Sequence, residues 1–158
     1  MNSVEVKIEG LEGIEKKLKQ LPANYIKRGL RRALRKGANV IRDDARTNAK
    51  SIDDPATKEA IYKNIAVAGG GASREKRAGG PIMRIGVRGG ARYNKGADGL
   101  PGGNTSGHWR FVEFGTAKQK AQPFMRNAIV TGAEKALNVT AASAQVELDK
   151  EISKLNVL

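Results

Sequence analysis

The residue types that usually carry catalysis are few in this chain, and their spacing does not bring them together. Neighbouring side chains on a helix point about 100° apart, so the pairs Asp43–Asp44 and Asp53–Asp54 would not converge on one substrate atom. The single histidine is His108. The sequence shows no nucleophile and no orienting residue with which it could act as a catalytic base. No cysteine is present, which excludes disulfides, thiol catalysis and cysteine-ligated metal. We therefore expect no enzymatic activity, no cofactor and no metal site.

Glycine is concentrated in the middle of the chain, where it could form a phosphate-binding loop. Thirteen of the 19 glycines fall between Gly69 and Gly107. The stretch GGGASREKRAGG, residues 69–80, nevertheless lacks the Gly-Lys-Ser/Thr ending that such a loop requires, so its glycines are interpreted as a flexible loop. Long loops in compact domains tend to be functional. We interpret residues 1–158 as one domain with a glycine-rich excursion at about 69–107.

Positive charge is the strongest chemical signal in the sequence. Lys and Arg number 29 against 16 Asp and Glu, which gives a formal net charge of +13. Basic residues recur at helical spacing on one face of a predicted helix, at Lys27, Arg28, Arg31, Arg32 and Arg35. This row could neutralise successive phosphates of a nucleic acid, or it could be a solvated face or meet acidic patches on a partner subunit. Aromatic residues make up 4%, so stacking platforms for single strands are not evident.

Hydrophobic periodicity indicates which elements position these residues. Apolar and small residues at intervals of three, four and seven predict one long amphipathic helix, and strict alternation near the N-terminus predicts a half-buried strand. Helices are expected at 11–21, 24–50 and 55–62, and from Pro123 through Ala136 or beyond, continuing or resuming after Asn138. Strands are expected at 3–9, 65–68, 82–87 and 109–114.

The order of these elements places the chain in the α+β class. We expect a small, mostly antiparallel sheet packed on the long basic amphipathic helix, with a C-terminal helix and long glycine-rich loops. No apolar stretch exceeds a few residues, so no membrane association is expected. The N-terminus lacks the apolar core of a secretory signal, and we expect a protein made in the cytoplasm.

Residues 109–129, WRFVEFGTAKQKAQPFMRNAI, resemble a motif of the neck or tail-completion proteins of long-tailed double-stranded-DNA phages and prophages. In that family an aromatic-x-x-Val-Glu-Phe-Gly-Thr strand end precedes an Ala-x-Pro-Phe-apolar-Arg-x-Ala helix start. The matching positions here are Val112, Glu113, Phe114, Gly115, Thr116, Pro123, Phe124, Met125 and Arg126. The Gly-Leu opening, the short leucine-rich helix and the long basic helix of the N-terminal half fit the same family.

The resemblance implies a structural virion protein made in the bacterial host cytoplasm and located at the phage head–tail junction. Such a protein joins the capsid connector to the tail, or completes the tail's upper end, by assembling into a ring of its own copies, with a hexamer favoured. In such a ring the glycine-rich excursion is expected to become ordered against neighbouring subunits or adjacent rings. The implied partners are further copies, head-closure or connector proteins, tail terminator or tail tube proteins, and packaged DNA through non-specific contact. The alternative from the residues alone is a nucleic-acid-binding module that uses the basic face of the long helix.

The motif can be explained by packing without any catalysis. On a strand, Phe111 and Phe114 would lie on opposite faces, so one is expected in the core and the other at an interface. Gly115 can adopt a positive φ that turns the chain, and Pro123 suits the first turn of a helix. Phe124 and Met125 would pack either in the core or between subunits. Glu113 and Arg126 are expected to form an ion pair.

Overall fold

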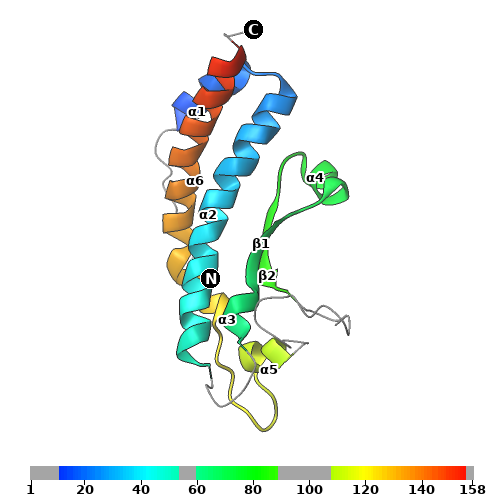
Figure 1. Cartoon of the computed structure of the whole chain (residues 1–158), viewed down its shortest axis with the longest axis vertical. Helices are drawn as coiled ribbons and strands as arrows, with labels where there is room; N and C mark the ends of the chain where they lie inside the picture. Colours follow the sequence, from blue (N-terminus) through cyan, green and yellow to red (C-terminus); the bar gives the residue numbers. More distant parts are fainter. Residues whose placement is uncertain (1–10, 54–59, 89–107, 156–158) are drawn as a thin grey trace. The chain divides into compact units, whose positions relative to one another are not determined.

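Two long helices, α2 and α6, contain half of the residues that the structure describes. The computed structural model describes residues 11–53, 60–88 and 108–155 (Figure 1). The elements are, in chain order, α1 (Leu11–Lys19), α2 (Ala23–Ser51), α3 (Ile61–Asn64), β1 (Ile65–Gly69), α4 (Ala72–Ala78), β2 (Met83–Val87), α5 (His108–Phe114) and α6 (Met125–Leu155).

The chain divides into two compact units, and α2 and α6 contribute residues to both. The first unit comprises Met1–Val40, Ala68–Arg84 and Glu134–Leu158, and the second comprises Ile41–Val67 and Ile85–Ala133. Helices together with a small sheet confirm the predicted α+β class. That residues 1–158 form a single domain stays a prediction.

In the first unit, α2 and α6 pack closely because small residues occupy their facing sides. Gly29 of α2 faces Leu148 of α6, and Gly37 faces Thr140 and Ala136, so the helices run antiparallel here. A Cβ atom at Gly37 would overlap Thr140 Oγ1 and lie 2.6 Å from the carbonyl oxygen of Ala136. The approach at Gly37 therefore requires the residue without a side chain.

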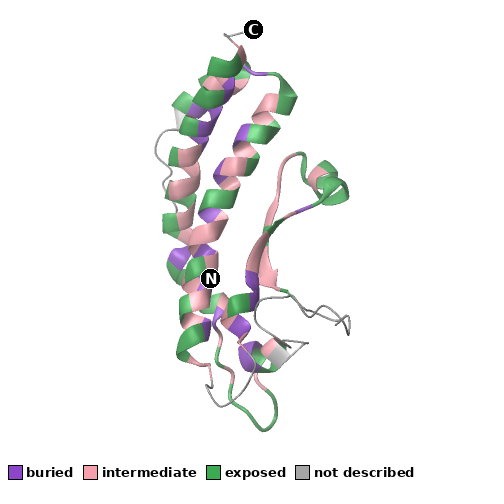
Figure 2. Ribbon diagram, in the orientation of Figure 1, coloured by how far each residue is buried: buried purple, intermediate pink, exposed green. Residues whose placement is uncertain are grey.

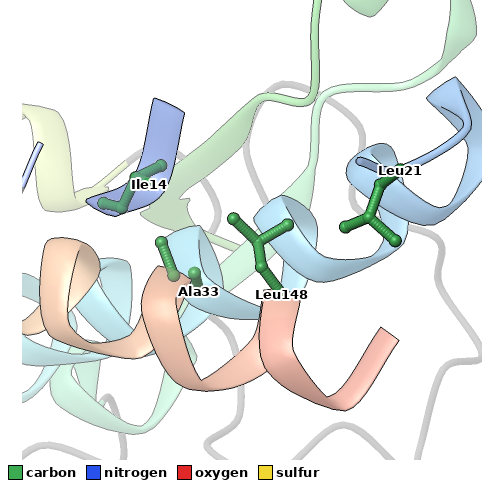
Figure 3. Close-up of a cluster of buried hydrophobic side chains, with 5 residues drawn as sticks. Ile14, Leu21, Ala33 and Leu148 are labelled. Carbon is green, nitrogen blue, oxygen red and sulfur yellow. The ribbon is translucent and has the colours of Figure 1, made fainter. Parts of the chain in front are cut away.

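The apolar core of the first unit forms where α1 meets the two long helices. Its buried members are Ile14, Leu21, Ala33, Ala144 and Leu148, four of which are labelled in Figure 3. Partly buried residues pack around them: Leu18, Tyr25, Ile26, Leu30, Ile152 and Leu155. Each fully buried aliphatic side chain of this kind contributes about 1.5–3 kcal/mol, which explains why the short helix α1 docks on the longer ones.

In the second unit, α2 and α6 also run antiparallel. Gly132 of α6 faces Ile41 and Asp44 of α2, and the Asn48 side chain donates a hydrogen bond to the carbonyl oxygen of Phe124 at 3.3 Å. The buried apolar residues of this unit are Ile41, Ala45, Ala49, Ile61, Ile65, Val112, Phe124 and Ala128 (Figure 2). These residues come from α2, α3, β1, α5, α6 and the position just before α6, so the unit is built from distant parts of the chain.

The sheet is a hairpin of β1 and β2. The backbone N–H of Gly70 donates to the carbonyl oxygen of Ile82 at 2.8 Å, and that of Arg88 donates to Asn64 at 2.9 Å. Both bonds fit one antiparallel register without a bulge, and they confirm the strands predicted at 65–68 and 82–87. The turn between them is not the flexible loop that was expected, because α4 occupies residues 72–78. The sequence ASREKRA consists mostly of good helix formers, and the glycines on both sides concealed this preference.

The prediction of a strand at 109–114 is wrong, because these residues form helix α5. Trp109 is half-buried, and Val112 and Glu113 are buried, a spacing of three and four residues that defines one face of a helix. Aromatic and β-branched residues favour strands, and a buried carboxylate does not register as an apolar position. The tertiary contacts of Glu113, described below, outweigh that preference.

The remaining expectations concern helix boundaries. The long helix predicted at 24–50 is confirmed as Ala23–Ser51, and the C-terminal helix runs without interruption to Leu155. The described part of the helix predicted at 55–62 begins only at Ile61. The strand predicted at 3–9, residues 54–59 and residues 89–107 of the glycine-rich excursion lie outside the described residues.

Candidate functional site

The motif residues are brought together in the second unit by α5, the turn after it and the first turn of α6. The backbone N–H of Gln122 donates to the carbonyl oxygen of Val112 at 2.8 Å, which returns the chain to α5 before α6 begins. Pro123 is half-buried and lies two residues before α6, not in its first turn as expected, because the helical hydrogen bonds begin at the carbonyl oxygen of Phe124. Phe124 is 1% exposed, so of the two roles left open for it, core packing is the one found. Met125 is half-buried as the first residue of α6.

Glu113 is a buried carboxylate, 1% exposed, and it caps the N-terminus of α6. The backbone N–H groups that it binds lie eleven to thirteen residues further along the chain. Its Oε2 accepts hydrogen bonds from the backbone N–H groups of Phe124 at 2.8 Å and Met125 at 2.9 Å. Its Oε1 accepts from the backbone N–H of Arg126 at 3.1 Å. The first N–H groups of a helix lack partners within it, and negative charge is favourable there. Glu113 therefore stabilises the point at which α6 starts.

The ion pair expected between Glu113 and Arg126 is confirmed. Arg126 Nε lies 3.2 Å from Glu113 Oε1, and Arg126 Nη2 donates to the Glu113 carbonyl oxygen at 2.6 Å. Sequence reasoning missed the capping bonds to the backbone. An acidic residue two positions before a glycine, with a Pro-Phe helix start some ten residues later, is the signal that could have indicated them.

The turn between α5 and α6 depends on Gly115 and Thr116. Gly115 has φ +76°, which confirms the positive φ expected there, although it ends a helix and not a strand. A Cβ atom on Gly115 would lie 2.8 Å from the backbone nitrogen of Ala121. Thr116 Oγ1 accepts from the backbone N–H groups of Lys118 at 3.2 Å and Gln119 at 3.0 Å. Each of these motif positions thus has a structural role within the chain.

Phe111 and Phe114 both lie on the surface, which corrects the expectation that one would enter the core. They are 55% and 62% exposed, and because α5 is a helix their spacing of three places them on one side. The Arg126 guanidinium lies over the Phe114 ring, 5.1 Å from its centroid. On α6, Ile129 and Val130 follow Arg126 by three and four residues and are 51% and 82% exposed. We call Phe111, Phe114, Ile129 and Val130 the apolar face.

The basic face predicted on α2 is partly neutralised within the first unit. Arg32 forms ion pairs with Glu147 at 2.6 Å and with Glu151, and Lys36 Nζ lies 3.0 Å from Glu147. Arg28 Nη1 lies 3.9 Å from Glu151. Both carboxylates are buried. Arg32 and Arg28 therefore meet acidic residues of their own chain, a pairing that sequence reasoning assigned only to partner subunits.

These contacts shift the titration of the buried carboxylates. The hydrogen bond from Lys36 is the main reason that the pKa of Glu147 falls from 4.5 to about 2, against the effect of burial. Burial is the largest influence on Glu151, but hydrogen bonds from Arg32 and Lys154 hold its pKa below the ordinary value. The bond to Glu151 raises the pKa of Arg32. All three groups are therefore charged at neutral pH.

Three exposed cations of α2 form the outer part of the basic face: Lys27, Arg31 and Arg35. Arg31 Nη2 lies 2.7 Å from Glu75 Oε2 of α4. Among the residues that the structure describes, Lys27 and Arg35 form no ion pair. We call these three residues the outer row.

Neither metal binding nor membrane insertion has support in the described parts of the chain. No three His, Asp or Glu side chains within residues 11–53, 60–88 and 108–155 are placed to hold a metal ion. The same residues include no helix of sufficient length and apolar character to span a bilayer.

A hollow of about 330 Å³ lies in the second unit and is lined by Arg46, Tyr62, Lys63, Ala66 and Arg88.

The site is thus a surface supported by buried polar contacts, as in a structural protein, and comparison with known families agrees. A family model described as "Bacteriophage HK97-gp10, putative tail-component" matches residues 12–115, and the chain belongs to this HK97-gp10-like family. No curated protein and no solved structure matches the chain. The family resemblance inferred from residues 109–129 is confirmed. The protein is accordingly a structural tail component of the virion that contacts other phage structural proteins.

Proposed function

We propose that the protein acts at the phage head–tail junction, where it joins the capsid connector to the tail or completes the tail's upper end. It does so by forming a closed ring of its own copies, with a hexamer favoured, that contacts head-closure or connector proteins on one side and tail terminator or tail tube proteins on the other. Packaged DNA meets the ring without sequence preference.

The apolar face carries this proposal. A large apolar group exposed on a folded unit indicates a surface that another protein covers. Phe114 stacked under Arg126 joins two residue types that are enriched at protein interfaces. The Glu113 cap holds both α5 and the start of α6 in place, so the face is preorganised before assembly, which lowers the entropy lost on binding.

In a ring the apolar face would contact a different surface of the neighbouring copy. Closure by rotation needs a head-to-tail contact between two different patches, so the apolar face of one copy would dock on another surface of its neighbour. The alternative function, a nucleic-acid-binding module centred on the basic face of α2, has less support. Two of the five cations assigned to it, Arg28 and Arg32, lie close to buried carboxylates of α6.

The test is the double variant Phe111→Ser/Phe114→Ser, with Val146→Ser as its control because Val146 is equally exposed (50%) but belongs to the first unit. Both variants should keep the helical circular dichroism of the parent chain. Phage lacking the gene, supplied with the double variant, should accumulate unjoined heads and tails in electron micrographs, whereas the control should restore complete particles. Full restoration by the double variant would exclude the apolar face as the interface.

A further inference from the structure

The first unit carries a cationic surface that the sequence divides between two distant segments. Glu75 of α4 binds Arg31, the middle residue of the outer row. This contact places α4 beside Lys27 and Arg35, which lie one helical turn to either side of Arg31. α4 itself adds Lys76 and Arg77, both exposed. Within the described residues neither Lys76 nor Arg77 has an ion-pair partner.

We propose that Lys27, Arg35, Lys76 and Arg77 form a contact surface for the phosphate backbone of double-stranded DNA. The outer row covers eight residue intervals of α2, from Lys27 to Arg35, which is about 12 Å at about 1.5 Å per residue. Duplex DNA presents one negative charge per about 1.7 Å of axis, so about seven phosphates pass along that length. The four cations form no ion pair among the described residues, so each can displace a counterion from the duplex.

The composition of the surface favours DNA over an acidic protein. Protein interfaces have an apolar core and are depleted in Lys. Among the described residues the exposed large apolar side chains are Phe111, Phe114, Ile129, Val130, Leu137 and Val146, and none of them belongs to α2 or α4. α4 also has no aromatic residue on which unpaired bases could stack. A backbone contact to a duplex needs only the charges that are present.

The proposal corrects the surface expected from the sequence. Arg28 and Arg32 are not part of the proposed DNA-contact surface, because they form ion pairs with Glu147 and Glu151. Residues of α4 are added to it. The proposed DNA contact rests on the proposed function in one respect, namely that the head–tail junction is where the protein meets packaged DNA. DNA affinity is measured on the purified chain and head–tail joining on particles, so the failure of one leaves the other intact.

The test measures binding of the full chain to a 30-base-pair duplex by fluorescence anisotropy at several salt concentrations. The variant Lys27→Gln/Arg35→Gln/Lys76→Gln/Arg77→Gln should bind at least about tenfold more weakly at low salt. Its plot of log affinity against log salt should be shallower by about 2–4, since each lost phosphate contact removes about 0.9 from the slope. Glu75→Gln should bind more tightly than the parent, because it removes a negative charge and frees Arg31.

The matched control removes the same charge from elsewhere, with Lys16→Gln/Lys118→Gln/Lys120→Gln/Lys135→Gln. These four residues are exposed and lie outside α2 and α4. The control should keep most of the parent's affinity and slope. Equal losses in control and test variants would mean that only net charge matters and would overturn the proposal. Unchanged DNA binding in the test variant would overturn it too, and would assign the surface to an acidic protein partner.

Discussion

A single carboxylate, that of Glu113, determines how the motif at residues 112–126 works. It satisfies three backbone N–H groups and one guanidinium at a site that is almost closed to solvent. An ion pair alone would add little, because the Arg126 side chain is 54% exposed and exposed pairs contribute about 0–1 kcal/mol. The capping bonds are the larger part, since a charged acceptor in a buried position makes strong hydrogen bonds.

The two contributions predict different losses of stability. Glu113→Ala should lower the free energy of unfolding by about 2–4 kcal/mol, because it leaves the N–H groups of Phe124, Met125 and Arg126 unsatisfied. Arg126→Gln keeps the cap and should cost about 1 kcal/mol or less. Urea unfolding followed by circular dichroism measures both. Equal losses would mean that the ion pair, and not the cap, stabilises this region.

Only part of this site could be predicted from the sequence. The Glu113–Arg126 pair could be predicted because both residues belong to one recognisable motif. The cap could not, because it depends on a turn that places a helix end against a side chain eleven residues earlier. The exposure of Phe111 and Phe114 was equally hidden, since it follows from α5 being a helix and not a strand.

At the scale of elements, the contact between α2 and α6 depends on glycine where most helices prefer alanine. Replacing an exposed helical Gly by Ala ordinarily stabilises a protein by about 0.5–1 kcal/mol. At Gly37 the added Cβ would instead overlap Thr140 and approach the backbone of Ala136. Overpacking of this kind costs about 1–3 kcal/mol, so the sign of the effect should reverse.

The prediction is that Gly37→Ala lowers the thermal midpoint of the protein, whereas Gly13→Ala does not. Gly13 lies in α1, where a Cβ atom would come no nearer than 4.0 Å to Gln145. Adding Thr140→Ala to Gly37→Ala should recover part of the loss, because it removes the Oγ1 that the new methyl overlaps. Scanning calorimetry on the four chains compares them directly. A Gly37→Ala variant as stable as the parent would mean that the helices can separate at no cost.

Elements with strong periodicity were predictable, and those defined by their neighbours were not. The apolar stripe of α2 fixes its limits to within a residue or so of 24–50. α4 and α5 are seven residues each, too short for periodicity to outweigh flanking glycines or a strand-favouring composition. The helix-forming residues of α4 were hidden by the glycines on both sides. The conformation of α5 is supported by contacts with residues further along the chain, such as Glu113 with the backbone of Phe124.

At the scale of the whole molecule, the formal charge of +13 overstates the positive surface that is free to bind a partner. Glu147 and Glu151 lie more than a hundred residues from Arg32. No local pattern could therefore reveal that the centre of the basic face is neutralised internally. The cations that have no ion-pair partner in the described part of the chain extend onto α4. Charge counted along a sequence and charge displayed by a fold are therefore different quantities.

This internal pairing ties the stability of the chain to pH with a definite sign. The pKa of Glu147 is about 2 in the folded protein against 4.5 ordinarily, so the unfolded chain binds more protons between these values and stability falls as pH falls. The contribution is complete above about pH 4.5 and lost as pH passes through about 2. At about 1.36 kcal/mol per pKa unit it amounts to about 3 kcal/mol. Protonation of the other carboxylates meanwhile raises the net charge towards the +29 of Lys and Arg alone, which adds self-repulsion.

Glu147→Gln separates the local pairing from the general repulsion. Repulsion acts on the parent and the variant alike, whereas the pairing exists only in the parent. The difference in unfolding free energy between them should be largest above pH 4.5 and shrink towards pH 2, as measured by urea titrations at pH 5, 4, 3 and 2. Glu134→Gln, an exposed position on the same helix, should differ from the parent by a small and constant amount. A Glu147→Gln difference that is independent of pH would show that Lys36 and Arg32 stabilise the helix pair without depending on the charge of Glu147.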